Sequence, residues 1–239
     1  MNSAMTDSAL YLIPSPLGDT NPAKVIPAST LEILRGIKTF VVENTRSARR
    51  YLSDAGLKGY IAELEFHELN EHSSAADARA LIPLFEKGDV GLISEAGLPA
   101  VADPGASLVA LCHEAGIRVV PLCGPSSLLL ALMASGLNGQ CFAFKGYLPA
   151  KTDERRAAIR RMEKESAAAC QTQIFIETPY RNDALLKDLL DCLSPATLLC
   201  AAADITLPDE FIHTARVASW RKAGITIGKR PCVFLILAR

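Results

Sequence analysis

The feature that most constrains the fold is an alternation of short apolar segments with longer segments whose apolar residues recur at helical spacing. In the first half, the apolar segments are residues 10–13, 38–43, 90–94 and 117–122, with a more ambiguous strand-like segment at 61–66. Strands that are buried on both faces read as continuous apolar runs, and parallel pairing requires helical crossovers. The first half is therefore predicted to form a parallel sheet covered by helices, one of them over residues 75–87.

The chain changes character near residues 121–125. The second half is predicted to contain a charged helix at 151–171, strands at 172–177, 197–202 and 231–238, and a helix at 182–192. A chain of 239 residues is long for one small core. We therefore predict an α/β fold with two α/β domains, residues 1–121 and 122–239.

Composition and charge exclude several classes of protein. Apolar residues make up 49% and charged residues 21%, as in globular proteins, and the net charge of −1 gives no overall attraction to nucleic acid. The longest apolar stretch, residues 126–137, is too short to span a bilayer. Residues 145–164 form a local basic patch, which predicts either a solvated helix face or a surface that faces the substrate.

Cysteine usage indicates a reducing compartment. The seven cysteines are scattered without C-x-x-C spacing, and the first residues carry no secretory signal. We expect a cytoplasmic protein with reduced, mostly buried thiols and no metal site.

Three loops rich in small residues follow predicted strands, at residues 14–19, 94–105 and 122–127. Ligands bind at the carboxyl ends of parallel strands, where glycine lets the backbone approach them closely. Three such loops indicate a nucleotide-like ligand. The chain lacks the phosphate-binding G-x-x-x-x-G-K-[ST] motif, a G-x-G-x-x-G after the first strand and a G-x-S-x-G elbow.

Six motifs occur in the order of one family. They are YLIPSPLGD at 11–19, ENTR at 43–46, SEAGLPAVADPG at 94–105, PLCGPSSLLLALMASGL at 121–137, FKGYLP at 144–149 and ETPYR at 177–181. The chain resembles the ribosomal RNA small-subunit methyltransferase I group of the tetrapyrrole methylase superfamily, over about residues 10–190. The resemblance implies two α/β domains that hold S-adenosylmethionine in a cleft between them, usually in a homodimer.

The resemblance also implies which residues contact the methyl donor. They are Leu17 and Gly18 in the first loop, Ala96 and Gly97 in the second, Ser126 and Ser127 in the third, and Ile176, Glu177, Ala202 and Pro231 in the second domain.

The implied reaction is 2′-O-ribose methylation of small-subunit ribosomal RNA. A base must remove the proton of the ribose hydroxyl, and the candidates are Glu43, Glu68, His72 and Glu177. Arg46 and Arg181 are candidates for holding a phosphate. We single out Glu43, Arg46 and Glu177 as catalytic candidates, although Glu43 and Arg46 could equally cap and pair at a helix start.

The chain departs from the family's pattern near the expected substrate side. Asn44 stands where the family usually has Asp, and Glu95, Leu98, Ala100 and Ala102 replace Asp, Thr, Gly and Ser. The chain also ends at its last predicted strand, without the family's usual C-terminal extension. Two alternatives therefore stay open: methylation of a small, tetrapyrrole-like acceptor, and a non-catalytic, donor-binding protein associated with RNA.

Overall fold

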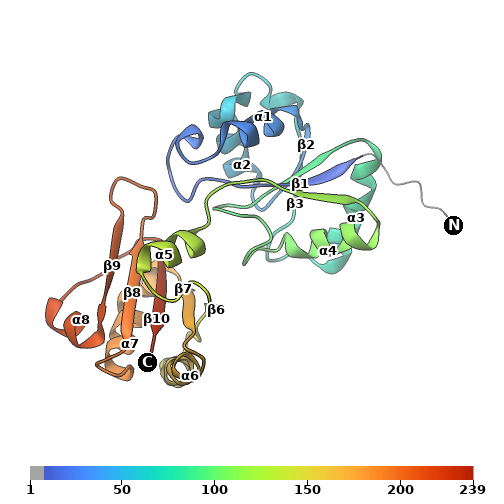
Figure 1. Cartoon of the computed structure of the whole chain (residues 1–239). Coiled ribbons are helices and arrows are strands. Elements are labelled where there is room, and N and C mark those ends of the chain that lie inside the picture. The colour runs from blue at the N-terminus through green and yellow to red at the C-terminus, as the bar shows by residue number, and fades with distance from the viewer. Residues whose placement is uncertain (1–7, 239) are drawn as a thin grey trace. The chain divides into compact units, whose positions relative to one another are not determined.

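The computed structural model of the chain describes residues 8–238. The chain divides into two compact units, the first ending at Ser126 and the second beginning at Ser127. Each unit has its own sheet and its own core (Figure 1). The predicted α/β fold with two sheets is therefore confirmed.

The first unit is built on a five-stranded sheet with the order β3-β2-β4-β1-β5. Its strands are β1 (Ala9–Ile13), β2 (Thr39–Val42), β3 (Glu65–Glu68), β4 (Val90–Ile93) and β5 (Arg118–Pro121). All four neighbouring pairs are parallel, so the carboxyl ends of the strands lie at one edge. The central strands β1 and β4, which are apolar throughout, thus lie inside the parallel sheet that the sequence predicts, and β3 and β5 are its edges.

Helices cover both faces of this sheet (Figure 1). The helices are α1 (Ala28–Gly36), α2 (Thr45–Leu52), α3 (Ala75–Ala80) and α4 (Ala106–Glu114), and shorter helical turns lie at Pro22–Lys24, Ser53–Leu57, Ile61–Glu63 and Ile82–Glu86. Helices α1 and α2 enclose a core around Phe40, whereas α3 and α4 enclose a second core around Phe85. The sheet is buried on both sides, which explains its continuous apolar strands.

Two predicted elements of this unit are wrong in part. The strand expected at 61–66 begins only at Glu65, after a 3-10 turn over Ile61–Glu63, and it is a half-exposed edge strand. The helix expected at 75–87 ends at Ala80 and gives way to a 3-10 turn that contains Pro83. Proline lacks the amide hydrogen that a continuing α-helix needs, and its ring clashes with the preceding turn.

The second unit is built on a mixed sheet with the order β6-β7-β10-β8-β9. Its strands are β6 (Phe142–Tyr147), β7 (Thr172–Glu177), β8 (Leu198–Ala203), β9 (Phe211–Arg216) and β10 (Cys232–Leu237). Only the pair of β6 and β7 is parallel. Strand β9 was not predicted from the sequence, because it is a half-buried edge strand without a clear alternation of apolar and polar residues.

The helices of the second unit are α5 (Ser127–Ser135), α6 (Thr152–Ala169), α7 (Asn182–Cys192) and α8 (Val217–Ala223), with a 3-10 turn at Pro179–Arg181. Its core contains the stacked rings of Phe175 and Phe234. The only tryptophan, Trp220, is 1% exposed and donates a hydrogen bond from Nε1 to the Leu199 carbonyl at 2.9 Å. Helix α8, which carries Trp220, was also not predicted.

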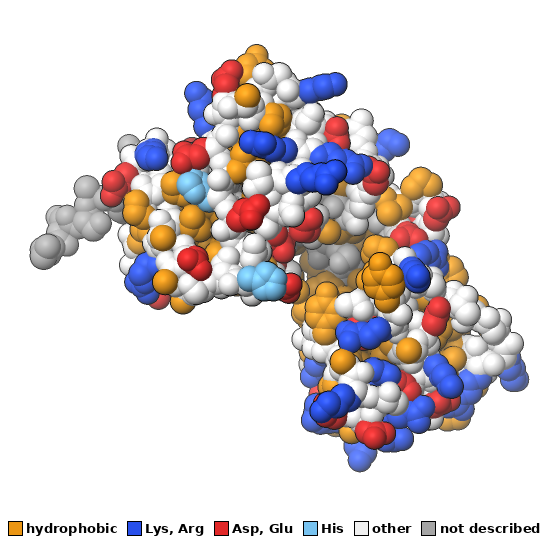
Figure 2. Space-filling view, turned by 180° about the vertical axis from the view of Figure 1, so that it is seen from behind, with side chains coloured by type: hydrophobic (Ala, Val, Ile, Leu, Met, Phe, Trp, Pro, Cys, Tyr) orange, Lys and Arg blue, Asp and Glu red, His pale blue; other side chains and the backbone are white. Residues whose placement is uncertain are grey.

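Intrachain ion pairs account for much of the predicted basic patch. Arg155 is 6% exposed and pairs with Asp188 at 2.6 Å. Arg156 bridges Asp188 and Asp191, and Lys145 pairs with Glu165. Figure 2 shows further Lys and Arg side chains spread over this unit among acidic ones. The interpretation as a charged helix face therefore explains most of the patch.

None of the described helices is long and apolar enough to cross a membrane. All seven cysteines are free thiols. Cys112, Cys200 and Cys232 are buried, as expected, whereas Cys123 and Cys170 are exposed.

Candidate functional site

The loops that follow β1 and β4 are joined at the carboxyl edge of the first sheet. Ser15 and Gly97 exchange backbone hydrogen bonds of 2.9 and 3.1 Å. The buried Ser15 hydroxyl also donates to the Ser94 carbonyl at 3.0 Å. Two of the three loops singled out in the sequence are therefore held together as one structure.

Glycine is required where these loops meet. Gly97 has a φ of +79°, and a β-carbon there would lie 3.1 Å from Leu17 Cδ2 and 3.4 Å from the Pro125 carbonyl oxygen. A β-carbon at Gly124, in the loop after β5, would lie only 2.2 Å from the Pro14 ring. All three predicted loops thus converge within the first unit, which their small residues allow.

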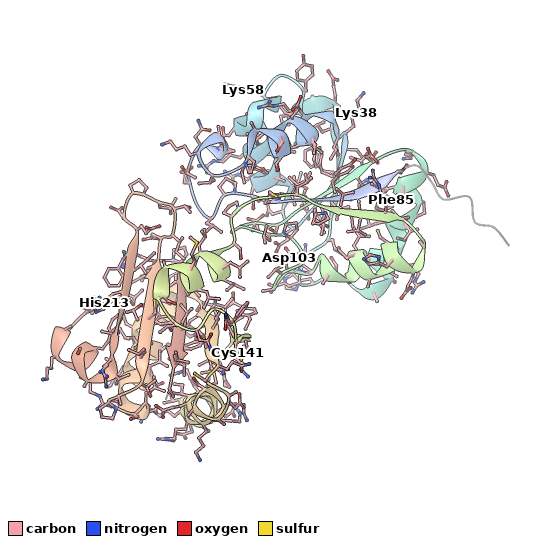
Figure 3. The ribbon with its side chains drawn as sticks, viewed as in Figure 1. Lys38, Lys58, Phe85, Asp103, Cys141 and His213 are labelled. Atoms are coloured by element: carbon pink, nitrogen blue, oxygen red, sulfur yellow. The ribbon has the colours of Figure 1, made fainter. Side chains whose placement is uncertain are left out.

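Asp103 organises the loop after β4 (Figure 3). Its Oδ1 accepts hydrogen bonds from the backbone amides of Ala100 at 3.1 Å and Gly105 at 2.7 Å. Ala100 and Ala102 adopt φ values of 64° and 57°, which are uncommon for residues other than glycine. The loop therefore keeps a strained path at two positions where the chain departs from the family's pattern, and strain of this kind is concentrated at functional sites.

A pocket of about 550 Å³ lies between the loop after β1 and helix α2. Its volume lies within the range of about 300–1,000 Å³ that is typical of small-molecule sites. Its wall has an apolar part, formed by Leu17, Val42 and Ile93, and a charged part with both signs. The charged part comprises Arg46, Arg50, Asp19, Asp54 and Glu95. The predicted contacts Leu17 and Gly18 and the catalytic candidate Arg46 all line this pocket.

Glu43 lies beside this pocket, although it is not among the lining residues. One of its oxygens accepts a hydrogen bond from the backbone amide of Glu95 at 3.0 Å, and the carboxyl group of Asp103 lies close by. Burial, together with the negative charges of Asp103 and Glu95, raises the pKa of Glu43 to about 7. A carboxyl group with this pKa exchanges protons readily at neutral pH.

Asn44 begins helix α2 as its N-cap. Its Oδ1 accepts the backbone amides of Arg46 at 2.9 Å and Ser47 at 3.2 Å. Asn and Asp cap helices about equally well. The departure from the family's Asp therefore preserves the helix start and removes a negative charge next to Glu43.

The other two candidate bases in the first unit have different surroundings. Glu68 accepts the backbone amide and the hydroxyl of Thr45, and these hydrogen bonds lower its pKa. The His72 side chain is 87% exposed and lies 3.7 Å from Glu71. Glu68 has a lowered pKa and His72 is exposed, so Glu43 is the strongest of these three candidates.

The predicted contacts of the second unit gather at one end of its sheet. Val233 of the central strand β10 pairs with Ile176 of β7 on one side and with Ala202 of β8 on the other. Pro231 immediately precedes β10, and its carbonyl accepts the Asp204 amide at 3.0 Å. The structure therefore brings Ile176, Ala202 and Pro231 together, although the sequence separates them widely.

Glu177 lies at the same end of this sheet and is 5% exposed. Its Oε1 accepts hydrogen bonds from Arg181 at 2.6 and 3.0 Å and from the Thr178 amide at 2.7 Å. Its Oε2 is buried and has no hydrogen-bond partner among the described residues. The ion pair with Arg181 makes Glu177 a weaker candidate base than Glu43, whereas the remaining oxygen can accept a hydrogen bond from a ligand.

The residues present fit a nucleoside-type methyl donor in two respects. The first unit offers glycine-lined backbone at the strand ends, and the second offers a buried carboxylate oxygen that lacks a partner. Within residues 8–238, no group of three or more His, Cys, Asp or Glu side chains is arranged to hold a metal ion.

Three residues of the site were not predicted from the sequence: Asp103 beside Glu43, and Arg50 and Tyr51 at the pocket. Arg50 follows Arg46 by one helical turn, so helical spacing could have found it. The Tyr51 hydroxyl donates to the Pro14 carbonyl at 2.8 Å and ties α2 to the loop after β1.

Comparisons with known proteins agree with this architecture. The sequence model of the tetrapyrrole (corrin/porphyrin) methylases matches residues 9–220. A ribosomal RNA small subunit methyltransferase I from Escherichia coli O157:H7 is 34% identical over 95% of this chain and 77% of its own length. The protein of the same name from Vibrio cholerae serotype O1 is 33% identical over 88% of this chain and 70% of its own length.

Among solved structures, a uroporphyrin-III C-methyl transferase from Thermus thermophilus, complexed with S-adenyl homocysteine, superposes with a TM-score of 0.58. The match covers 96% of this chain and 97% of that chain at 18% identity, so it shows a shared fold. The two-unit fold, the family match and the identity to curated relatives together show that the chain is a methyltransferase of the tetrapyrrole methylase family and belongs with the ribosomal RNA small subunit methyltransferase I proteins.

Proposed function

We propose that the protein transfers a methyl group from S-adenosylmethionine to a ribose 2′-hydroxyl of small-subunit ribosomal RNA. The observation that carries this proposal is the half-buried Glu43, whose pKa is raised to about 7 beside a pocket that also contains Arg46. The names of the relatives that are 33–34% identical supply the substrate class.

Glu43 acts as the general base. A ribose hydroxyl is a weak nucleophile, so a nearby group must take its proton as the methyl group is transferred. Because its pKa is about 7, Glu43 is ionised in a substantial fraction of the molecules at neutral pH. The same pKa lets the carboxylate keep the proton that it takes from the ribose hydroxyl. Its hydrogen bond to the Glu95 amide fixes the orientation of the carboxylate.

The family resemblance supplies the residues that contact the methyl donor. Its contacts are Leu17, Gly18, Ala96, Gly97, Ser126, Ser127, Ile176, Ala202 and Pro231, as the family resemblance implies. Glu177 Oε2 accepts a hydrogen bond from the donor, and this satisfies an oxygen that is otherwise buried without a partner. The donor supplies an electrophilic sulfonium methyl group, so the protein contributes mainly alignment and deprotonation.

The protein acts in the cytoplasm as a homodimer in this proposal. Large apolar side chains remain exposed on the second unit, including Met133 of α5 at 76% and Tyr147 of β6 at 59%. An association surface accounts for such exposure. Light scattering on the purified protein measures its mass, and a monomeric mass would contradict this part of the proposal.

The two alternatives differ from this proposal in measurable ways. A methyltransferase for small acceptors would bind the donor but leave the ribose methylation of ribosomal RNA unchanged. A non-catalytic, donor-binding protein would bind donor and RNA without transferring the methyl group. The curated relatives at 33–34% identity favour the ribosomal RNA enzyme over both.

Ribose-methylation mapping of small-subunit ribosomal RNA tests the proposed function. Deletion of the gene is expected to remove a 2′-O-methyl group, which the wild-type gene restores and Glu43→Gln does not. A map that is unchanged by the deletion would reject ribosomal RNA as the substrate. Calorimetry with S-adenosylmethionine, run alongside, shows whether the donor still binds.

A further inference from the structure

We propose that the pocket between the loop after β1 and helix α2 receives the target nucleotide of the RNA, and that Arg46 and Arg50 hold its phosphates. This inference rests on the proposed function and adds the place where the RNA strand enters the first unit. It concerns the acceptor, whose proposed pocket shares the loop after β1 with the expected donor contacts Leu17 and Gly18.

Arg46 and Arg50 lie on one side of helix α2, because they are four residues apart, and both line the pocket. Within residues 8–238, Arg46 forms no ion pair with a carboxylate, so its charge is available to a ligand. Arg50 pairs with Asp19, and both side chains are largely exposed, at 67% and 86%. An exposed ion pair of this kind contributes little to stability, so Arg50 can exchange Asp19 for a phosphate.

The start of helix α2 does not offer an alternative anion site. The Thr45 amide donates to Glu68, and the Arg46 and Ser47 amides donate to the Asn44 side chain. Because the amides that usually bind an anion at a helix start are occupied, recognition of a phosphate falls to the arginine side chains.

The wall of the pocket suits a nucleotide. Leu17 offers an apolar surface against which a base or a ribose can pack, with Val42 and Ile93 buried beneath the pocket. Polar and acidic side chains also line it, namely Thr20, Ser47, Asp54 and Glu95. Enzymes and RNA-binding proteins read unstacked nucleotides in such mixed pockets. Of the residues that the donor is expected to contact, Leu17 and Gly18 line the pocket and Ala96 and Gly97 do not, so the pocket adjoins the donor loops.

Arg49 provides a matched control on the same helix. It lies next to Arg50, but its guanidinium stacks over the Phe66 ring at 5.2 Å and does not line the pocket. Arg49→Ala and Arg50→Ala remove the same charge from the same turn of α2. They differ in whether the lost side chain faces the pocket.

The test measures the affinity of the full-length protein for unmethylated small-subunit ribosomal RNA, over a range of salt concentrations, and for S-adenosylmethionine by calorimetry. Arg50→Ala is expected to weaken RNA binding about 10-fold and to reduce the salt slope by about one, with unchanged donor affinity. Asp19→Asn frees Arg50 and is expected to tighten RNA binding about threefold. Arg49→Ala is expected to behave as wild type in both assays.

Three results would overturn the inference. Arg50→Ala and Arg49→Ala could weaken RNA binding equally, which would mean that only overall charge matters. Arg50→Ala could abolish donor binding, which would assign the pocket to the donor. If the wild-type protein itself neither binds nor methylates this RNA, the proposed function fails together with the inference, and the wild-type control distinguishes that case from the other two.

Discussion

The two units of the molecule treat their charged side chains in opposite ways. In the second unit, the carboxylate of Asp188 is buried between Arg155 and Arg156, and Glu177 is paired with Arg181. In the first unit, the like-charged Glu43, Glu95 and Asp103 lie near one another at the ends of β2 and β4. The buried Asp188 pairs of the second unit serve stability, whereas the acidic cluster of the first unit lies where it can take part in chemistry.

The largest effect on activity is expected in the first unit, from substitution of Glu43. Glu43→Gln removes the base and should lower the rate of methyl transfer by about 10²–10⁴-fold in a single-turnover assay. The raised pKa of Glu43 stabilises the fold below the ordinary carboxyl pKa, and this contribution is lost as the pH rises through about 7. We therefore expect Glu43→Gln to be no less stable than wild type at pH 8.

Glu68→Gln is the matched control for this substitution. Glu68 is bonded to Thr45 at the start of α2, and its pKa is lowered by that contact. The rate of methyl transfer by Glu68→Gln should stay within a few-fold of the wild-type rate. A larger loss in Glu68→Gln than in Glu43→Gln would contradict the assignment of the base.

In the second unit, the loss of a buried charge should lower the stability of the fold. Asp188→Ala leaves Arg155 buried without its carboxylate and should lower the free energy of unfolding by about 3–5 kcal/mol. Urea unfolding followed by the fluorescence of Trp220, which lies in the core of this unit, measures the loss.

Asp191→Ala is the control, because Asp191 pairs with Arg156 from a side chain that is 48% exposed. Asp191→Ala should lower the free energy of unfolding by less than about 1 kcal/mol. Equal effects of the Asp188 and Asp191 substitutions would show that burial does not govern these pairs.

A smaller effect is expected where the strand-end loops meet. Gly97→Ala should destabilise the protein by about 1–2 kcal/mol and weaken donor binding, because the residue has positive φ and abuts Leu17. Gly116→Ala is the control, since Gly116 also has positive φ but no atom within 4 Å of an added β-carbon. Calorimetry with the donor should separate the two variants, and equal donor affinities would argue against a donor site at Gly97.

The smallest effect is expected at Asn44. Asn44→Asp keeps the N-cap and should change the free energy of unfolding by less than about 0.5 kcal/mol, whereas Asn44→Ala should cost about 1 kcal/mol. The added negative charge should raise the pKa of Glu43 further. A loss of stability as large as that of Asn44→Ala would show that Asp cannot cap this helix.

The sequence predicted the parallel sheet of the first unit because its central strands β1 and β4 are covered on both faces and read as continuous apolar runs. It did not predict β9, whose residues are half-buried along their length. Periodicity identifies elements that have a clear apolar face, so an edge strand with mixed residues gives no clear signal.

The candidate site could be predicted only in part. Family motifs pointed to Glu43, Arg46 and the three loops. The pKa of Glu43 depends on burial and on Asp103, which lies far along the chain, and the buried state of Arg155 depends on Asp188 of another helix. Such properties arise from tertiary contacts, which local patterns do not contain.

The most direct test of the central assignment is the pH dependence of methyl transfer under single-turnover conditions. Because Glu43 must be ionised to accept a proton, the wild-type rate should rise about tenfold per pH unit below pH 7 and level off above it. Glu43→Gln should show a low rate without this inflection. An inflection near pH 7 that persists in Glu43→Gln, or a wild-type rate that does not change between pH 5 and 8, would contradict the account.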